Sequence, residues 1–151
     1  MSPSLGRATD RRLRAPPVHT GAMTTITTDQ AAVLAEPLYG HLGTIRPDNT
    51  VQVNPMWFFF DGESLRFTHT TKRGKFRNLQ HNPSMSFEII DPVNPFNYTE
   101  VRGELAEVIP DPDGAFYVQL GVRYGNPGQL PPPDSADRVI LVMHISKVIS
   151  G

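Results

Sequence analysis

Apolar and polar residues alternate along much of this chain, which is the pattern of β-strands with one buried face. The clearest case is the segment 84–90, where Met85, Phe87 and Ile89 alternate with polar residues. Similar patterns predict further strands over residues 39–45, 51–60, 64–70, 98–109 and 138–149. The chain is therefore expected to be mainly β, with six antiparallel strands.

Short helices are expected between some of these strands. Thr28 is the expected N-cap of a first helix that ends near Pro37, and further helices are predicted over 72–81 and 115–124. The proline-rich segments 91–97 and 125–137 are expected to be loops. Antiparallel strands with few helices favour a barrel, because closure removes exposed strand edges, and a sandwich is the alternative.

The predicted strand 51–60 ends in five consecutive large apolar residues, Met56 to Phe60. Alternation places apolar side chains on both of its faces, whereas an antiparallel strand of a small monomer usually has one solvated face. We therefore expect one face to pack in the core and the other to meet a second copy of the chain or a flat ring. This pattern predicts a homodimer. For Trp57, the only tryptophan, simple core packing is the alternative.

Composition limits the possible functions. The chain has 151 residues, a net charge of −1 and no cysteine. It therefore has no disulfides, thiolate metal sites or cysteine nucleophiles, and no general attraction to nucleic acid or membranes. It has no apolar run long enough for a membrane-spanning helix, and its five histidines form no zinc signature. We expect a cytoplasmic protein without a bound metal.

Residues 1–22 differ from the rest of the chain. They contain four arginines and one acidic residue, show no hydrophobic periodicity and lack the apolar core of a secretory signal. A basic organellar transit peptide is one interpretation. We favour a disordered N-terminal extension over 1–22, with a natural start at Met23 and one cofactor-binding domain over 23–151.

A basic turn follows the strand 64–70. After Thr70 and Thr71, four cationic side chains occur within six residues: Lys72, Arg73, Lys75 and Arg77. Hydroxyl groups, unpaired backbone N–H groups and positive charge therefore meet where a strand gives way to a helix. This arrangement suits a phosphate group, although a solvated basic turn is the alternative.

Several motifs follow one order along the chain. They are Gly43-Thr-Ile45, Val51-Gln-Val-Asn-Pro-Met-Trp57, Asp61-Gly62, Lys75-Phe-Arg-Asn-Leu79 followed by Asn82-Pro83, and Val101-Arg-Gly103. In this order, over about residues 28–151, the chain resembles the split β-barrel superfamily of flavin- and deazaflavin-binding proteins, which includes pyridoxamine-phosphate oxidase. Within it, the chain is most similar to the coenzyme F420-dependent oxidoreductases of actinobacteria.

The resemblance implies a six-stranded antiparallel split β-barrel in a homodimer, with the cofactor in a groove at the subunit interface. The phosphate end of the cofactor would contact Thr70, Thr71, Lys72 and Lys75, with Arg73 and Asn78 close by. The ring would lie along Asn54, Pro55, Met56 and Trp57.

The resemblance also implies a reaction, hydride transfer between coenzyme F420 and a small conjugated substrate. Two alternatives remain, an FMN-binding flavoprotein like pyridoxamine-phosphate oxidase, and a non-catalytic carrier of F420 or a tetrapyrrole. No residue set resembles a nucleophile with its base, so no catalytic side chain is assigned. A redox cofactor would carry the chemistry itself.

Three further residues have possible roles of their own. His69 is either a phosphate contact or a neutral, partly buried histidine. Tyr124 either lines the groove or only ends the helix before it. Arg102 is expected to form a structural ion pair with Glu100 or Glu104.

Overall fold

The computed structural model describes residues 24–151, which form one antiparallel sheet and three short α-helices. The strands are β1 (Gly40–Ile45), β2 (Val51–Met56), β3 (Phe59–Phe60), β4 (Ser64–Thr70), β5 (Ser84–Ile90), β6 (Tyr98–Pro110) and β7 (Arg138–Ser150). The helices are α1 (Thr28–Leu34), α2 (Gly74–His81) and α3 (Ala115–Arg123), with a 3₁₀ turn, η3 (Ser135–Asp137), before β7.

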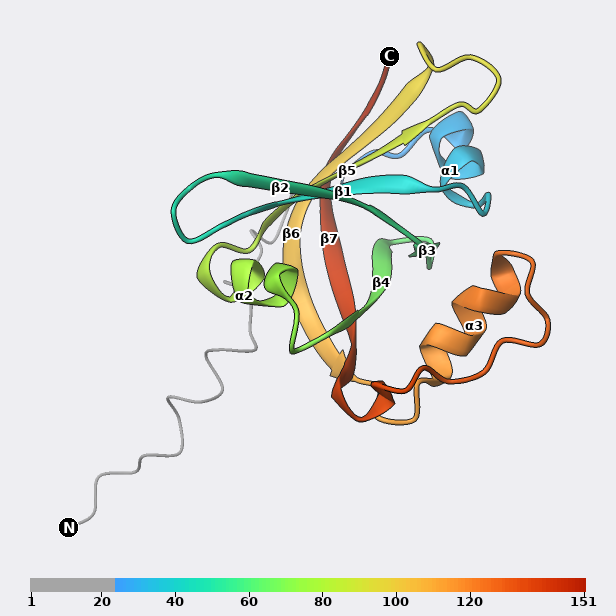
Figure 1. The fold of residues 1–151 in the computed structure, drawn as a ribbon. Helices are drawn as coiled ribbons and strands as arrows, with labels where there is room; N and C mark the ends of the chain where they lie inside the picture. Colours follow the sequence, from blue (N-terminus) through green and yellow to red (C-terminus); the bar gives the residue numbers. More distant parts are fainter. Residues whose placement is uncertain (1–23) are drawn as a thin grey trace.

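The strand order in the sheet is β2-β1-β5-β6-β7-β4-β3. The two edge strands, β2 and β3, are consecutive in the chain, and only Trp57 and Phe58 join them. The sheet must therefore curl until its two edges approach each other, as Figure 1 shows. This confirms the predicted mainly β split barrel. It has seven strands rather than six, because the segment 51–60 is divided into two.

The division falls at Trp57 and Phe58. Phe58 is fully buried in the core, and its backbone N–H donates to the Tyr124 hydroxyl at 3.0 Å. Trp57 leaves the strand and stacks on the Tyr124 ring. The interpretation of 51–60 as one strand with two apolar faces is therefore wrong. Pro55, which lacks an N–H group, is tolerated because β2 is an edge strand.

Three phenylalanines fill the centre of the barrel. The Phe87 ring meets Phe58 edge-on at 5.0 Å and Phe67 at 5.1 Å between ring centroids. Gly40 on β1 is required here, because a Cβ at this position would collide with the Phe87 ring. The large aromatic core fixes the distance between the two halves of the curled sheet, and so the width of the split between its edges.

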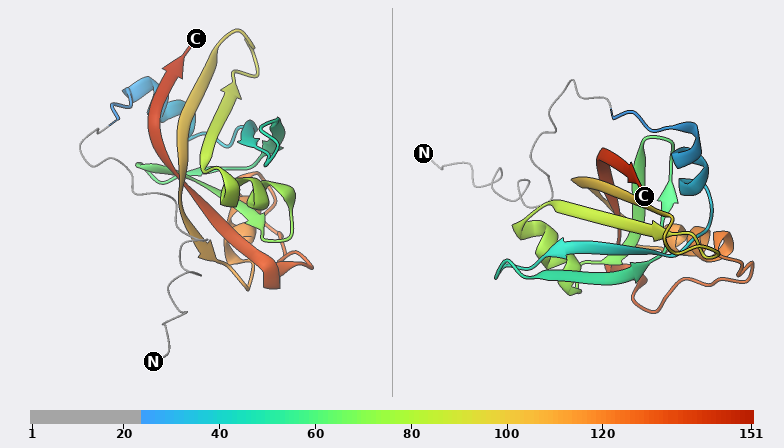
Figure 2. Two further views of the ribbon diagram at one scale, coloured as in Figure 1. Left: turned by 90° about the vertical axis from the view of Figure 1, so that its left-hand side faces the viewer. Right: turned by 90° about the horizontal axis from the view of Figure 1, so that it is seen from above.

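Hydrogen bonds tie the helices to the sheet and to each other. The N-cap of α1 is Thr27 rather than the expected Thr28, and it forms a capping box with Gln30. Gln30 also donates from Nε2 to Ser150 Oγ at 3.0 Å, which ties α1 to the end of β7. In Figures 1 and 2, α1 lies beside the C-terminus. The last residue of α3, Arg123, donates to the carbonyl oxygens of Ala35 and Glu36, directly after α1, so the ends of these two helices lie close together.

Among the remaining expectations, the ion pair of Arg102 with Glu100 is confirmed, at 2.8 Å. The predicted disordered extension over 1–22 lies outside the described residues. No helix in the described part of the chain is long and apolar enough to cross a membrane.

Candidate functional site

A pocket of about 550 Å³ opens at the split of the barrel. The residues that line it come from the edge strand β2, from β4, α2, α3 and β7 and from the segments beside them: Tyr39, Asn54, Pro55, Met56, Trp57, Thr68, His69, Arg73, Lys75, Tyr117 and Arg138. A larger pocket of about 630 Å³ lies beside α1 and the loop 91–97, but its only charged side chains are the acids Asp29, Glu36 and Asp91. The pocket at the split combines three cations, Arg73, Lys75 and Arg138, with aromatic rings. A smaller pocket at Phe59 and Phe116 also contains a cation, Arg66, but that cation is paired with Asp61. The pocket at the split is therefore the candidate site.

Two open strand edges border this pocket. The short β3 pairs with β4 only at Leu65 and Arg66, so within residues 24–151 the segment 67–70 has a strand neighbour on its β7 side alone. The edge strand β2 pairs only with β1. Such edges present backbone N–H and C=O groups that no neighbouring strand uses. The pocket can therefore bind a flat molecule through its polar rim.

Arg73 and Lys75 form the α2 wall of the pocket. Arg73 is the N-cap residue of α2, and no side chain caps this helix, so its first N–H groups remain available. Lys75 is only 8% exposed, and burial, together with the nearby Arg73, lowers the pKa of its ammonium group. Neither cation forms an ion pair within residues 24–151. A buried cation without a counter-ion is unfavourable, so this wall suits an anion.

His69 lies beside this cation pair. Its side chain is 2% exposed, and its Nε2 atom is buried with no hydrogen-bond partner in the described part of the chain. Burial, followed by the charges of Lys75, Arg73 and Arg138, lowers the pKa of His69 to about 4, although Asp134 acts in the opposite direction. The ring is therefore neutral at pH 7. An unpartnered buried polar atom in a pocket wall indicates a group completed by a ligand.

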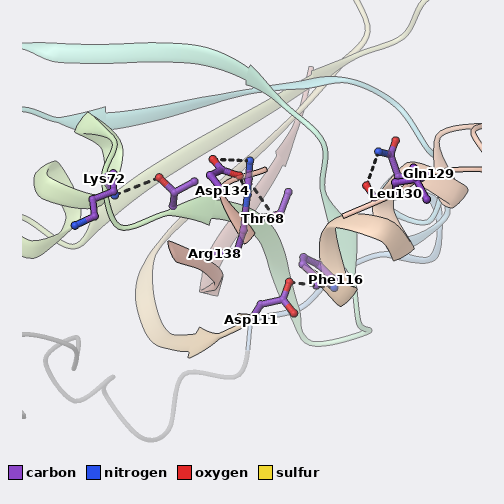
Figure 3. Close-up of polar contacts among 9 residues, drawn as sticks. Thr68, Lys72, Asp111, Phe116, Gln129, Leu130, Asp134 and Arg138 are labelled. Carbon is purple, nitrogen blue, oxygen red and sulfur yellow. Dashed lines mark hydrogen bonds and ion pairs between the residues drawn. The ribbon is translucent and has the colours of Figure 1, made fainter. Parts of the chain in front are cut away.

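Arg138 forms the β7 wall and is also 8% exposed, but it has its partners within the chain. Its Nε donates to Asp134 Oδ1 at 3.1 Å, and its guanidinium also donates to Thr68 Oγ1 at 3.4 Å. Figure 3 shows Arg138 between Asp134 and Thr68. The guanidinium carbon lies 4.8 Å from the Tyr117 ring centroid. This cation is already neutralised, so it shapes the pocket rather than supplying free charge.

An aromatic wall faces the cations. The Trp57 ring stacks on Tyr124 at 5.3 Å with an interplanar angle of 13°, and lies 5.7 Å from Tyr117. The Tyr124 hydroxyl donates to the Leu38 carbonyl at 2.7 Å, and burial raises its pKa. Tyr124 is the C-cap residue of α3, which confirms that it ends this helix. It does not line the pocket itself but supports a lining residue, Trp57, so the interpretation of Tyr124 as a groove residue is wrong.

Six of the ten residues predicted for cofactor binding line this pocket: Asn54, Pro55, Met56, Trp57, Arg73 and Lys75. The other four do not. Thr70 Oγ1 accepts from the Lys72 N–H within the turn, and the Thr71 N–H donates to the Asp137 carbonyl at the end of η3. The Asn78 amide donates to Thr44 and Gln52, which fastens α2 to β1 and β2. Their cofactor contacts stay predictions.

Four lining residues were not anticipated: Tyr39, Thr68, Tyr117 and Arg138. Arg138 opens the last predicted strand and had no motif around it. Tyr117 lies on a helix that was predicted for its apolar pattern alone. Within residues 24–151, no group of three or more His, Asp or Glu side chains gathers that could hold a metal ion.

A split barrel with an anion-binding wall and an aromatic wall defines a class of cofactor-binding proteins. Residues 26–150 match the family model of pyridoxamine 5'-phosphate oxidase, and the chain belongs to this family. No curated protein matches the chain.

Solved structures give a finer comparison. The chain is 52% identical to a structure named F420 reductase, covering 98% of that chain and 82% of this one, with a TM-score of 0.79. It is 22% identical to the conserved hypothetical protein Rv2991 from Mycobacterium tuberculosis, covering 84% of that chain and 83% of this one, with a TM-score of 0.64. A pyridoxamine 5'-phosphate oxidase-related, FMN binding protein from Nostoc punctiforme is 17% identical, with coverages of 85% and 83% and a TM-score of 0.59. The last two similarities concern the fold alone.

Proposed function

We propose that this protein is a coenzyme F420-dependent oxidoreductase that transfers a hydride between the deazaflavin and a small conjugated substrate. The observation that carries the proposal is the pocket at the split, which is lined by Trp57 and by Arg73 and Lys75, two cations that form no ion pair within residues 24–151. The 52% identity to a structure named F420 reductase, over nearly all of that chain, favours the deazaflavin among the cofactors that such a pocket could take.

The residues present fit such a cofactor. Its anionic tail requires fixed positive charge, which Lys75, Arg73 and the uncapped start of α2 provide. Its ring requires a flat slot with backbone donors and acceptors along one side, which the open edge of β2 at Asn54–Met56 and the ring of Trp57 provide. The unpartnered Nε2 of His69 lies in the same wall.

When bound, the deazaflavin supplies the hydride chemistry, and the chain supplies position and surroundings. Lys75 and Arg73 hold the anionic end. The Asn54–Met56 edge orients the ring in its plane, and Trp57, held by Tyr124, excludes water from one side. The predicted contacts of Thr70, Thr71, Lys72 and Asn78 would come from the turn and from α2 directly behind this wall.

We also retain the homodimer, with the cofactor at the subunit interface, as a proposal. Its support is the outer surface of β2, where Val51 and Val53 are 63% and 58% exposed. A pocket bordered by open strand edges is incomplete on its outer side, and a second subunit would close it. A cytoplasmic location is likewise a proposal, supported by the absence of cysteine.

An FMN-dependent flavoprotein is the second candidate. FMN needs the same anion wall and the same flat slot, and a protein of this fold is named FMN binding. A non-catalytic carrier of F420 or a tetrapyrrole is the third, because the pocket contains no nucleophile paired with a base.

Trp57 makes the test direct, because it is the only tryptophan and lines the pocket. Its fluorescence should be quenched when F420 is added to the purified protein, and less so or not at all with FMN. Reduced F420 is then incubated with a quinone, an enone and a tetrapyrrole, and its oxidation is followed by the return of deazaflavin fluorescence. Binding of F420 without turnover of any acceptor would favour the carrier, whereas binding of FMN alone would overturn the F420 assignment.

A further inference from the structure

Beside the α2 wall, on β4, the pocket contains a buried base that the proposed hydride transfer does not use. His69 is 2% exposed, lines the pocket and has a buried Nε2 atom without a hydrogen-bond partner in residues 24–151. Buried polar atoms in folded proteins nearly always have a partner. The unpartnered Nε2 therefore indicates that a ligand in the pocket changes the surroundings of this histidine.

Burial first, and then the charged groups around His69, explain why its ring is neutral. Lys75 projects from α2, Arg73 precedes that helix, and Arg138 lies at the start of β7. The anion Asp134, in the loop before β7, acts in the opposite direction, but both of its carboxylate oxygens already accept from Arg138. A proton on His69 would thus add a further positive charge to a buried cluster that already has an excess of it.

An anion bound in the pocket would make protonation of His69 less unfavourable. A phosphate between Lys75 and Arg73 would offset the two charges that most oppose protonation of the ring, apart from burial itself. We propose that His69 is a proton-linked part of the anion site: the anionic tail of the ligand enters the pocket together with a proton, which His69 takes up from solvent. This inference rests on the proposed function of the pocket as the cofactor site.

Two consequences follow from linkage. The ligand raises the affinity of His69 for a proton, and the proton raises the affinity of the pocket for the ligand by the same factor. Ligand affinity should therefore increase as the pH falls below about 7, approaching tenfold per pH unit where one full proton is taken up. Above pH 8 the affinity should not depend on His69 protonation.

Calorimetric titration in two buffers of different ionisation enthalpy counts the protons taken up on binding. F420 is the preferred ligand because its phosphodiester does not titrate near neutral pH, whereas the phosphomonoester of FMN does. We expect uptake of close to one proton at pH 5.5 and close to none at pH 8. In the His69→Gln variant, uptake at pH 5.5 should vanish. The deazaflavin chromophore without its phosphate tail is the matched ligand control: any proton uptake that it shows comes from the ring system itself and is subtracted.

A second measurement keeps the two proposals apart. The His69 pKa is followed by nuclear magnetic resonance of its ring protons, alone and with F420, FMN or inorganic pyrophosphate. We expect a pKa near 4 in the free protein and a rise to at least the ordinary histidine value of 6.5 with a bound anion. If F420 does not bind but pyrophosphate raises the pKa, the proton-linked site stands and the cofactor assignment fails. If no anion raises it, or if His69→Gln takes up as many protons as the wild type, the inference is wrong.

Discussion

The α2 wall and the β7 wall of the pocket contain equally buried cations with opposite surroundings. Lys75 and Arg138 are each 8% exposed. Arg138 has the carboxylate of Asp134, the hydroxyl of Thr68 and the ring of Tyr117. Lys75 has no ion-pair partner in residues 24–151 and lies near a second cation, Arg73.

This difference separates groups that hold the fold from groups that hold a ligand. A buried charge must be neutralised, and Arg138 is neutralised by its own chain. The charge of Lys75 is left for a molecule from outside. Removal of the Arg138 charge should therefore lower the stability of the protein, whereas removal of the Lys75 charge should weaken ligand binding.

The largest effect should come from pH, through His69 on the α2 wall. Its folded-state pKa of about 4 lies below the ordinary value of 6.5. Above pH 6.5 the ring is neutral in both states; between pH 6.5 and 4 the unfolded chain binds a proton that the folded protein does not. Stability should therefore fall as the pH falls through this window, by up to about 3 kcal/mol.

Urea unfolding of the ligand-free protein at pH 7.5 and at pH 4.5 measures this loss. In His69→Gln and His69→Phe the difference between the two pH values should shrink, whereas in His41→Gln, which changes an exposed histidine on β1, it should persist. An unchanged difference in both His69 variants would show that other groups cause the acid sensitivity.

Replacement of Lys75 by methionine should give the next largest effect. The variant keeps the length and volume of the side chain but removes its charge, and cofactor affinity should fall by about 1.5–3 kcal/mol, or roughly 10- to 150-fold. The unfolding free energy of the ligand-free protein should stay the same or rise, because an unpaired buried charge is gone.

Lys72→Met is the matched control for Lys75→Met. Lys72 belongs to the same turn but is exposed and does not line the pocket. Tryptophan quenching in low salt measures both affinities. A larger loss for Lys72→Met than for Lys75→Met would mean that the anion binds outside the pocket described above.

Arg138→Met should act on stability rather than on charge in the pocket. We expect a loss of about 2 kcal/mol in unfolding free energy, below the range for fully buried pairs, because the Asp134 side chain is 38% exposed and can be rehydrated. Arg102→Met removes an exposed ion pair with Glu100 and should lose under about 1 kcal/mol. Equal losses of unfolding free energy in Arg138→Met and Arg102→Met would mean that Arg138 contributes no more to stability than an exposed ion pair does.

The sequence predicted these two walls unequally, for a physical reason. Lys75 and Arg73 belong to a local motif, a strand that ends in threonines followed by a basic turn, and charge density in a short segment is visible without a structure. Arg138 lies 65 residues after Arg73 in the chain, and only the β4–β7 pairing, with Thr70 opposite Arg138, brings it to the same pocket. Such long-range pairing leaves no local signal.

The fold shows the same division between local and distant information. Alternation predicted the strands β4 and β5 with their observed bounds. It failed at 51–60, because the break depends on Tyr124, which lies 66 residues from Phe58 and accepts from its backbone N–H. Asn78 was assigned to the cofactor from the motif, yet its amide hydrogens go to Thr44 and Gln52, partners that the motif does not contain.

The smallest effect should come from Tyr124→Phe. This variant tests whether the hydroxyl of Tyr124 stabilises the fold, as Arg138 does, or binds the ligand, as proposed for Lys75. The change removes the hydroxyl that links the Leu38 carbonyl to the Phe58 N–H but keeps the ring that stacks on Trp57. We expect a loss of about 1 kcal/mol in unfolding free energy.

Cofactor affinity of Tyr124→Phe should change less than about threefold, since the stacked ring remains, and Trp57 emission should keep its wavelength. Tyr98→Phe changes a tyrosine that is 38% exposed, and its stability should stay within about 0.5 kcal/mol of the wild type. If Tyr124→Phe instead lost affinity as strongly as Lys75→Met, with stability intact, the hydroxyl would contact the ligand. The aromatic wall, like the α2 wall, would then bind the cofactor directly rather than only stabilise the fold.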